Sequence, residues 1–259
     1  MTRPEGTVDG SQVSQGAPVV VMPRLLVGTP GEVGARLVTV AGIAGLVFAI
    51  LFIVTFALLR VGLPPLEPVA FRSWWDANRD RVAIGTYLVP FVGMAFIWFV
   101  AAVRHRIGRG EGLFFSTVFL GSALVFVAML FATGAAEASV LAAIENFDGG
   151  HVESLAAFGQ ALAYAFFFGF TVKMSAMFML VVASIGRSTG VLPRWLVLLS
   201  IIFGVAVLVV NTVWEIVALV FPVWVAMVSL ILIRLARAQG GADDPAGPEP
   251  GAAQESAVP

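Results

Sequence analysis

Residues 37–59 read LVTVAGIAGLVFAILFIVTFALL and stand between Arg36 and Arg60. An apolar run of about 20 residues is long enough to cross the hydrocarbon core of a bilayer as a helix. Five further runs of this kind follow before Arg237, and they span residues 82–103, 113–133, 156–184, 192–211 and 216–233. The sequence therefore predicts an all-α fold, a polytopic membrane bundle of six transmembrane helices.

The composition of the whole chain agrees with a membrane protein. Of 259 residues, 59% are hydrophobic and 12% are charged, whereas about a quarter of a soluble domain is charged. The formal net charge of −1 offers no basic surface for nucleic acid. We expect the lipid bilayer as a partner and no nucleic acid. A homo-oligomer, a membrane protein partner and a small-molecule ligand of unknown identity stay open.

Both ends of the chain differ from the middle. Residues 1–35 are rich in Gly, Pro, Ser and Thr, and the segment after Arg237 has no apolar periodicity. Such compositions favour solvated, disordered segments. We predict disordered cytoplasmic tails over 1–35 and 238–259, with a transmembrane domain over 36–237 between them.

The arginines predict how the bundle is oriented. With a cytoplasmic N-terminus, the inner segments carry ten arginines and the outer segments carry four, all within residues 60–81. Cytoplasmic loops are enriched in Lys and Arg. We therefore predict a multi-pass protein of the cell membrane with both termini in the cytoplasm.

Few residues in the sequence are suited to catalysis. The chain has no cysteine and only two histidines, which excludes thiol catalysis and cysteine-ligated metals. No nucleophile-and-base motif, phosphate-binding glycine loop or zinc motif is present. We therefore expect no catalytic residues, no cofactor and no metal site, and the sequence favours a protein that is not an enzyme.

Lys173 is the one formal charge inside a predicted span. An ionisable residue within a membrane helix is by default a functional-site hypothesis, because its burial is costly. Ala161, Ala165 and Gly169 precede it at four-residue spacing, and small residues let another helix approach closely. We therefore expect Lys173 to point into the bundle, where a ligand site would comprise Lys173, Tyr87 and Ser175.

The depth of Lys173 has two interpretations, because its apolar run is longer than a bilayer requires. With a core at 164–184, Lys173 lies near the midplane, and with a core at 157–177 it lies near the cytoplasmic surface. In the second case its aliphatic stem would let the amine reach water. The lysine is then structural and binds no ligand.

Two predicted outer loops carry further candidates. The second loop holds the polar residues Glu137, Glu145, Asn146, Asp148, His151 and Glu153. It is either a solvated acidic loop or a site for a divalent cation. The first loop, 61–81, contains Trp74 and Trp75, and it reads as an interfacial anchor or as a lid over an outward-facing cavity.

Ala41, Gly45 and Ala49 form a stripe of small residues on the first span. Such a stripe suits close helix packing, either within one subunit or between subunits. Pro90 and Pro222 fall inside the second and sixth spans, where each removes a backbone hydrogen bond and can kink its helix.

Several segments resemble an uncharacterised family of six-helix membrane proteins of high-GC Gram-positive (actinobacterial) type, which carries a domain of unknown function. They are Trp74-Trp75 with Arg79-Asp80-Arg81, the stretch IWFVAAVRHR at 97–106, the alanine-rich third span and Leu192-Pro-Arg-Trp195. The resemblance covers residues 36–237. It implies the six-helix fold, and it implies no activity or site residues.

Two functions follow from these observations. The scarcity of polar residues within the spans favours a non-enzymatic structural or accessory membrane component. Lys173 instead favours a small-molecule or ion transporter whose site includes this residue. A lipid-modifying enzyme would need a reactive group of side chains that the sequence does not display.

Overall fold

The structure, a computed structural model, describes residues 30–60, 65–107, 113–146, 151–190, 192–210 and 215–240. These residues form helices joined by short connections. In chain order they are α1 (Pro30–Leu59), α2 (Pro68–Ile107), α3 (Leu113–Asn146), α4 (Val152–Tyr164), the π-helix η2 (Ala165–Thr171), α5 (Val172–Thr189), α6 (Arg194–Val210), the 3-10 helix η3 (Glu215–Leu219) and α7 (Val220–Gly240). The fold is all-α, as predicted.

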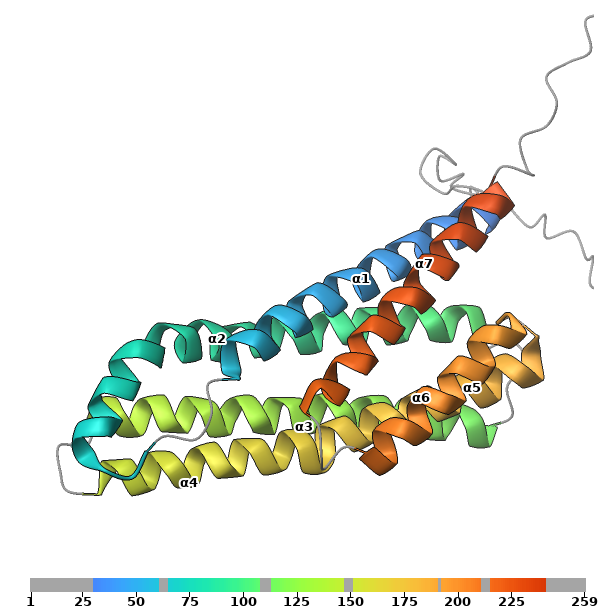
Figure 1. Cartoon of the computed structure of the whole chain (residues 1–259). Helices are drawn as coiled ribbons and strands as arrows, with labels where there is room; N and C mark the ends of the chain where they lie inside the picture. Colours follow the sequence, from blue (N-terminus) through green and yellow to red (C-terminus); the bar gives the residue numbers. More distant parts are fainter. Residues whose placement is uncertain are drawn as a thin grey trace, which may run out of the picture.

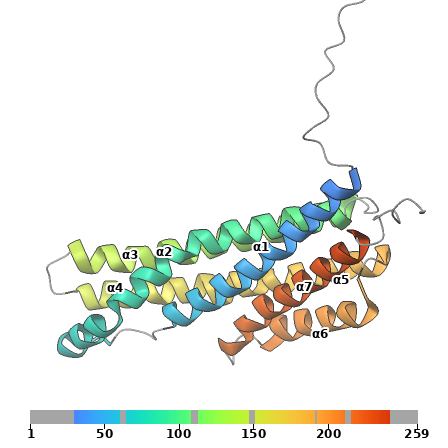
Figure 2. The same cartoon turned by 90° about the horizontal axis from the view of Figure 1, so that it is seen from above.

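The helices form one elongated bundle (Figure 1). α1 packs between α2 and α7, α2 packs against α3, and α3 packs against α4, η2 and α5. α6 packs mainly on α5 at the edge of the bundle, which is clearest from above (Figure 2). The start of α1 and the end of α7 lie together at one end of the bundle.

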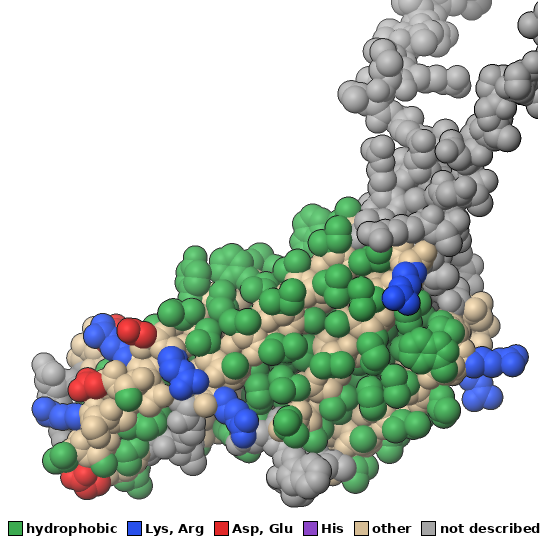
Figure 3. All heavy atoms as spheres, turned by 45° about the horizontal axis from the view of Figure 1, so that its top comes forward, with side chains coloured by type: hydrophobic (Ala, Val, Ile, Leu, Met, Phe, Trp, Pro, Cys, Tyr) green, Lys and Arg blue, Asp and Glu red, His purple; other side chains and the backbone are tan. Residues whose placement is uncertain are grey.

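The described part of the chain contains five helical segments that are long and apolar enough to cross a membrane. On the face shown in Figure 3, hydrophobic side chains cover the middle and charged side chains gather toward both ends. This distribution is the one that a bilayer requires. The chain is therefore a multi-pass membrane protein. α6 is apolar but shorter than the five, so a sixth span stays a prediction.

Helix extends into both predicted tails. α1 begins at Pro30 and α7 ends at Gly240, so residues 30–35 and 238–240 are helical, contrary to the predicted boundaries. Proline suits the first position of a helix, because the amide hydrogen it lacks would have no partner there. The rest of the predicted tails, residues 1–29 and 241–259, lies outside the described residues.

Most of the first predicted outer loop is also helical. Glu67 accepts hydrogen bonds from the backbone amides of Val69 and Ala70 at 3.1 and 2.7 Å. This carboxylate caps the N-terminus of α2, where amides lack partners and a negative charge is favoured. α2 then runs without a break from Pro68 to Ile107. The predicted anchor is thus the first part of α2, while residues 61–64 lie outside the described residues.

The extended ends of α2, α3 and α4 pack together beyond the end of α1. Phe71 of α2, Val140 of α3 and Ala156 of α4 form a small buried cluster. Arg79 of α2 also pairs with Glu145 of α3 at 3.6 Å on the surface. The buried cluster and this exposed pair both join α2 to α3 at this end of the bundle.

Five phenylalanine rings meet where the long helices cross. Phe96 of α2 lies 5.0 Å from Phe48 of α1 and 4.6 Å from Phe126 of α3, measured between ring centroids. Phe178 of α5 and Phe221 of α7 lie 5.3 and 5.7 Å from the same ring. All five are fully or almost fully buried. Aromatic pairs at these separations are worth about 0.5–1.5 kcal/mol beyond their buried area, so this aromatic cluster joins five helices at one point.

The small residues of α1 allow close helix packing within the subunit. A methyl group added at Gly45 would lie 2.0 Å from Ser229 Oγ of α7 and 2.6 Å from the Phe99 ring of α2. Ala49 on the same stripe is also buried. α1 therefore depends on Gly45 to approach both neighbours. The side chain of Ala41 lies outside the described residues.

We expect Gly45→Ala to lower the free energy of unfolding by about 1–3 kcal/mol, because the added methyl group forces the closely packed Phe99 ring to move. Thermal unfolding of the purified protein in detergent measures the effect. Gly121→Ala on α3 is the matched control, since an added methyl group there has nothing within 4 Å. Equal stability of the two variants would contradict the close packing of α1.

Candidate functional site

The three residues predicted to form a ligand site differ in how deeply they are buried. Lys173 is exposed on the outer surface of α5, and Tyr87 is 70% exposed on α2. Ser175 is buried, and its hydroxyl donates to the carbonyl oxygen of Val172 at 2.7 Å. One side chain thus points inward and two point outward. A ligand-binding role for these residues stays a prediction, and none of the three lines the cavity described below.

The expectation that Lys173 points into the bundle is wrong. Ala161 and Ala165, the small residues used to place it, are exposed as well. A methyl group added at Gly169 would have nothing within 4 Å. The stripe of small residues therefore faces outward. Spacing alone cannot show whether a helix packs against the stripe.

The predicted acidic outer loop is mostly helix. α3 continues past Thr133 to Asn146, and α4 begins at Val152. The segment after Thr133 is rich in alanine, the strongest helix former, which explains the extension. Glu137 accordingly lies inside α3 and is only 4% exposed. The described residues contain no group of three or more metal-ligating side chains, and Asp148 lies outside them.

A cavity of about 390 Å³ opens between the C-terminal half of α1 and the α4–η2 segment. Its remaining walls come from α2 and α3 through Val89, Val92, Leu130 and Thr133. Binding pockets for small molecules are typically about 300–1,000 Å³, and they are mostly apolar with a few polar groups. This cavity matches that description in both size and lining.

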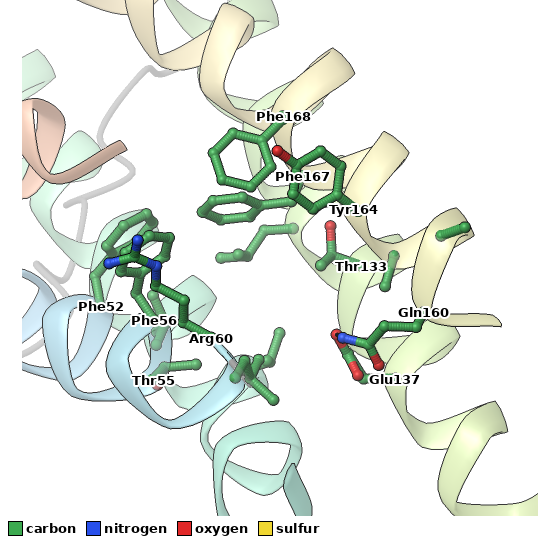
Figure 4. A pocket seen from close by; sticks show the side chains of 16 residues that line it. Phe52, Thr55, Phe56, Arg60, Thr133, Glu137, Gln160, Tyr164, Phe167 and Phe168 are labelled. Carbon is green, nitrogen blue, oxygen red and sulfur yellow. Dashed lines mark hydrogen bonds between the residues drawn. The ribbon is translucent and has the colours of Figure 1, made fainter. Parts of the chain in front are cut away.

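Aromatic rings form much of the wall (Figure 4). Phe52 and Phe56 of α1 face Phe167 of η2, with ring centroids 6.0 and 5.7 Å apart. Tyr164 and Phe168 stand beside them, 4.4 Å apart. Phe52 also contacts Phe48 of the aromatic cluster. The cavity therefore begins directly beside the aromatic cluster.

The π-helix η2 supplies two of these rings. In a π-helix the backbone amides donate to carbonyl oxygens five residues earlier. Thr171 Oγ1 adds a side-chain hydrogen bond to the carbonyl oxygen of Phe166 at 3.1 Å. Both Phe167 and Phe168 line the cavity. π-helical turns inside α-helices occur frequently at functional sites.

The polar part of the wall is a buried pair from α3 and α4. Gln160 Nε2 donates a hydrogen bond to Glu137 Oε1 at 3.1 Å. Both residues are more than nine-tenths buried and both line the cavity. Buried charged groups in proteins are normally paired or hydrogen-bonded, because leaving them without partners is costly.

The pair leaves two buried acceptor atoms without partners. Glu137 Oε2 and Gln160 Oε1 receive no hydrogen bond from any described residue, and Thr55 Oγ1 on the opposite wall is also without one. Most buried polar atoms in native proteins have a partner. Buried acceptors without partners on residues that line a cavity are unusual in a native protein.

Arg60 stands on the other side of the cavity, at the end of α1 (Figure 4). It is exposed, and it follows the last residue of the helix. The cavity is thus bordered by a guanidinium on the α1 side and by a carboxyl group on the α3 side. A molecule that fills it meets apolar rings along its length and polar groups at both sides.

The sequence contains a signal for this pair, namely one polar residue in each of two neighbouring helical segments. Glu137 lies within an alanine-rich segment that continues the third span, and Gln160 lies in the first part of the fourth. Polar residues that face each other inside a helix pair are conspicuous once both helices are known to extend that far. Because the third span was predicted to end at Thr133, Glu137 was assigned to a loop and its pairing with Gln160 was not predicted.

No family model, curated protein or solved structure matches this chain. The resemblance to a six-helix bacterial family therefore stays a prediction. The chemistry of the site rests on the residues that line the cavity.

Gln160→Leu should lower the free energy of unfolding by about 1–3 kcal/mol, because Glu137 Oε1 would lose its buried donor. The double variant Glu137→Leu/Gln160→Leu should recover most of this loss, since replacing both partners with apolar groups can be nearly neutral. Chemical or thermal unfolding in detergent compares the two.

Asn146→Leu is the control for this pair. Asn146 is an exposed amide near the end of α3, and its Nδ2 donates to the carbonyl oxygen of Ala142 at 2.8 Å. Its replacement should change stability by less than about 0.5 kcal/mol, as is usual at surfaces. If the double variant is no more stable than Gln160→Leu, the two side chains do not act as a buried pair.

Proposed function

We propose that this membrane protein binds a small amphipathic molecule in the cavity between α1 and the α4–η2 segment. The observation that carries the proposal is the cavity itself. It combines aromatic walls with two buried acceptors that have no partner among the described residues. A purely structural component gives no reason to keep unsatisfied polar atoms beside an open space, because closing that space would gain packing.

The position of the cavity supports entry from the bilayer. Phe52 and Phe56 reach the α4–η2 segment through ring contacts with Phe167. Ala161 and Tyr164, which line the same cavity, are exposed on the outer surface of the bundle. A molecule dissolved in the lipid can therefore reach the cavity from the side.

Of the two functions favoured by the sequence, the proposal keeps the small-molecule role and assigns it to a different site. A small-molecule role was predicted around Lys173, whereas the cavity is lined by Glu137, Gln160 and aromatic residues. Lys173 is not among the residues that line it. Binding is the property that the geometry supports, and a transport step would require a second arrangement of the helices.

Photocrosslinking tests the proposal in a bilayer. The protein is placed in phosphatidylcholine nanodiscs with dodecyl alcohol that carries a diazirine, and labelled peptides are mapped by mass spectrometry. We expect labelling concentrated on cavity residues of α1 and the α4–η2 segment, and unlabelled dodecanol should compete for it. Ala161→Phe, at the exposed edge of the cavity, should lower this labelling at least about fivefold, because the ring narrows the entrance.

Ala138→Phe is the matched control, since Ala138 is exposed on α3 and does not line the cavity. It should label like the unaltered protein. Labelling spread evenly over all lipid-facing helices, without competition and with no effect of Ala161→Phe, would overturn the proposed function.

A further inference from the structure

The polar side of the cavity has a composition that selects among amphipathic molecules. Glu137 Oε2 and Gln160 Oε1 are both acceptors, and neither receives a hydrogen bond from a described residue. Gln160 already uses its Nε2 to donate to Glu137 Oε1. A ligand group that satisfies both acceptor atoms therefore needs more than one N–H or O–H donor.

The same place also favours a positive charge. A carboxyl group in an apolar wall carries its charge only where a cation or several donors offset the cost of burial. Gln160 supplies one neutral donor. Arg60 stands on the α1 side of the cavity, across from Glu137 (Figure 4). A cation carried by a ligand beside Glu137 would offset the charge of its ionised form.

We propose that the cavity selects a primary ammonium group attached to an apolar chain, with the ammonium donating to Glu137 Oε2 and Gln160 Oε1. An ammonium carries three donors and no acceptor, which complements two acceptor atoms that belong to one hydrogen-bonded pair. The apolar chain would lie among Phe52, Phe56 and Phe167, whose ring faces also attract cations. This inference rests on the proposed function and names the chemical class of its ligand.

Two sources can supply this chemistry within a membrane. One is the headgroup of an aminophospholipid, in which the ammonium is linked to a phosphate, and the other is a free long-chain amine. Arg60 on the opposite side of the cavity suits a phosphate, because guanidinium groups bind phosphate strongly. The shared feature is the primary ammonium beside Glu137, and the experiment separates the two sources.

The test uses the full-length protein in phosphatidylcholine nanodiscs, which contain no primary amine. Cavity labelling by the diazirine-bearing dodecyl alcohol is competed with dodecylamine, dodecyltrimethylammonium and dodecanol. We expect dodecylamine to compete at least about 10-fold more tightly than dodecanol, the factor typical of a hydrogen bond to a charged group. Dodecyltrimethylammonium carries the charge without N–H donors, so it should fall between them.

Glu137→Gln should reduce the preference for dodecylamine over dodecanol to less than about threefold, because the variant keeps the shape of the side chain and removes its charge. The control is Glu145→Gln on the same helix, whose side chain is 53% exposed. It should keep the full preference. Thermal unfolding of both variants confirms that they are folded, and Gln160→Leu provides a second variant at the site.

The outcomes separate this inference from the proposed function. If dodecylamine and dodecanol compete equally and Glu137→Gln changes nothing, the ammonium site is overturned while the cavity remains a binding site. If neither competes, the proposed function fails with it. Replacing part of the phosphatidylcholine with phosphatidylethanolamine should lower cavity labelling in the unaltered protein and not in Glu137→Gln when the source is the lipid headgroup. If dodecylamine lowers the labelling and phosphatidylethanolamine does not, the source is a free long-chain amine.

Discussion

The architecture depends on the contact of five phenylalanine rings from five helices. Phe96 lies at the centre, and its neighbours come from α1, α3, α5 and α7. Within a bilayer, helices gain little from hydrophobic burial, because lipid tails are as apolar as the side chains, so close packing must hold the bundle together. The five large, rigid rings provide that packing at the point where the five helices meet. The glycines of α1 complete it by letting α7 and α2 approach closely.

The cavity is a consequence of how the helices diverge from this point. α1 stays with α2 and α7, while the α4–η2 segment follows α3 beyond the end of α1. Between them the walls are made by rings that touch at their edges and by the Glu137–Gln160 pair. Phe167 and Phe168 of the π-helix form part of the wall. The same helices thus combine a tightly packed centre with an open, partly polar compartment.

The apolar runs predicted the fold class and the order of the long helices, because bilayer thickness sets a length that is visible in composition. The helix ends were harder to predict. Glu137 interrupts the hydropathy of α3 without ending the helix, because it pairs with Gln160 of α4. Glu67 lies just before α2 and caps its first turn. Lys173 shows the opposite error. Its charge identified an unusual position, but its direction depends on which helices pack against α5, and no periodicity within one helix contains that information.

The central claim is that the space beside Glu137 is an occupied binding site in the membrane. The most direct measurement is an electron cryo-microscopy structure of the protein in nanodiscs made from native lipid. We predict density for an elongated molecule between α1 and η2, with its polar end within hydrogen-bonding distance of Glu137 Oε2 and Gln160 Oε1. A structure in which Phe56 and Tyr164 fill the space and α1 packs directly on α4 would contradict the account.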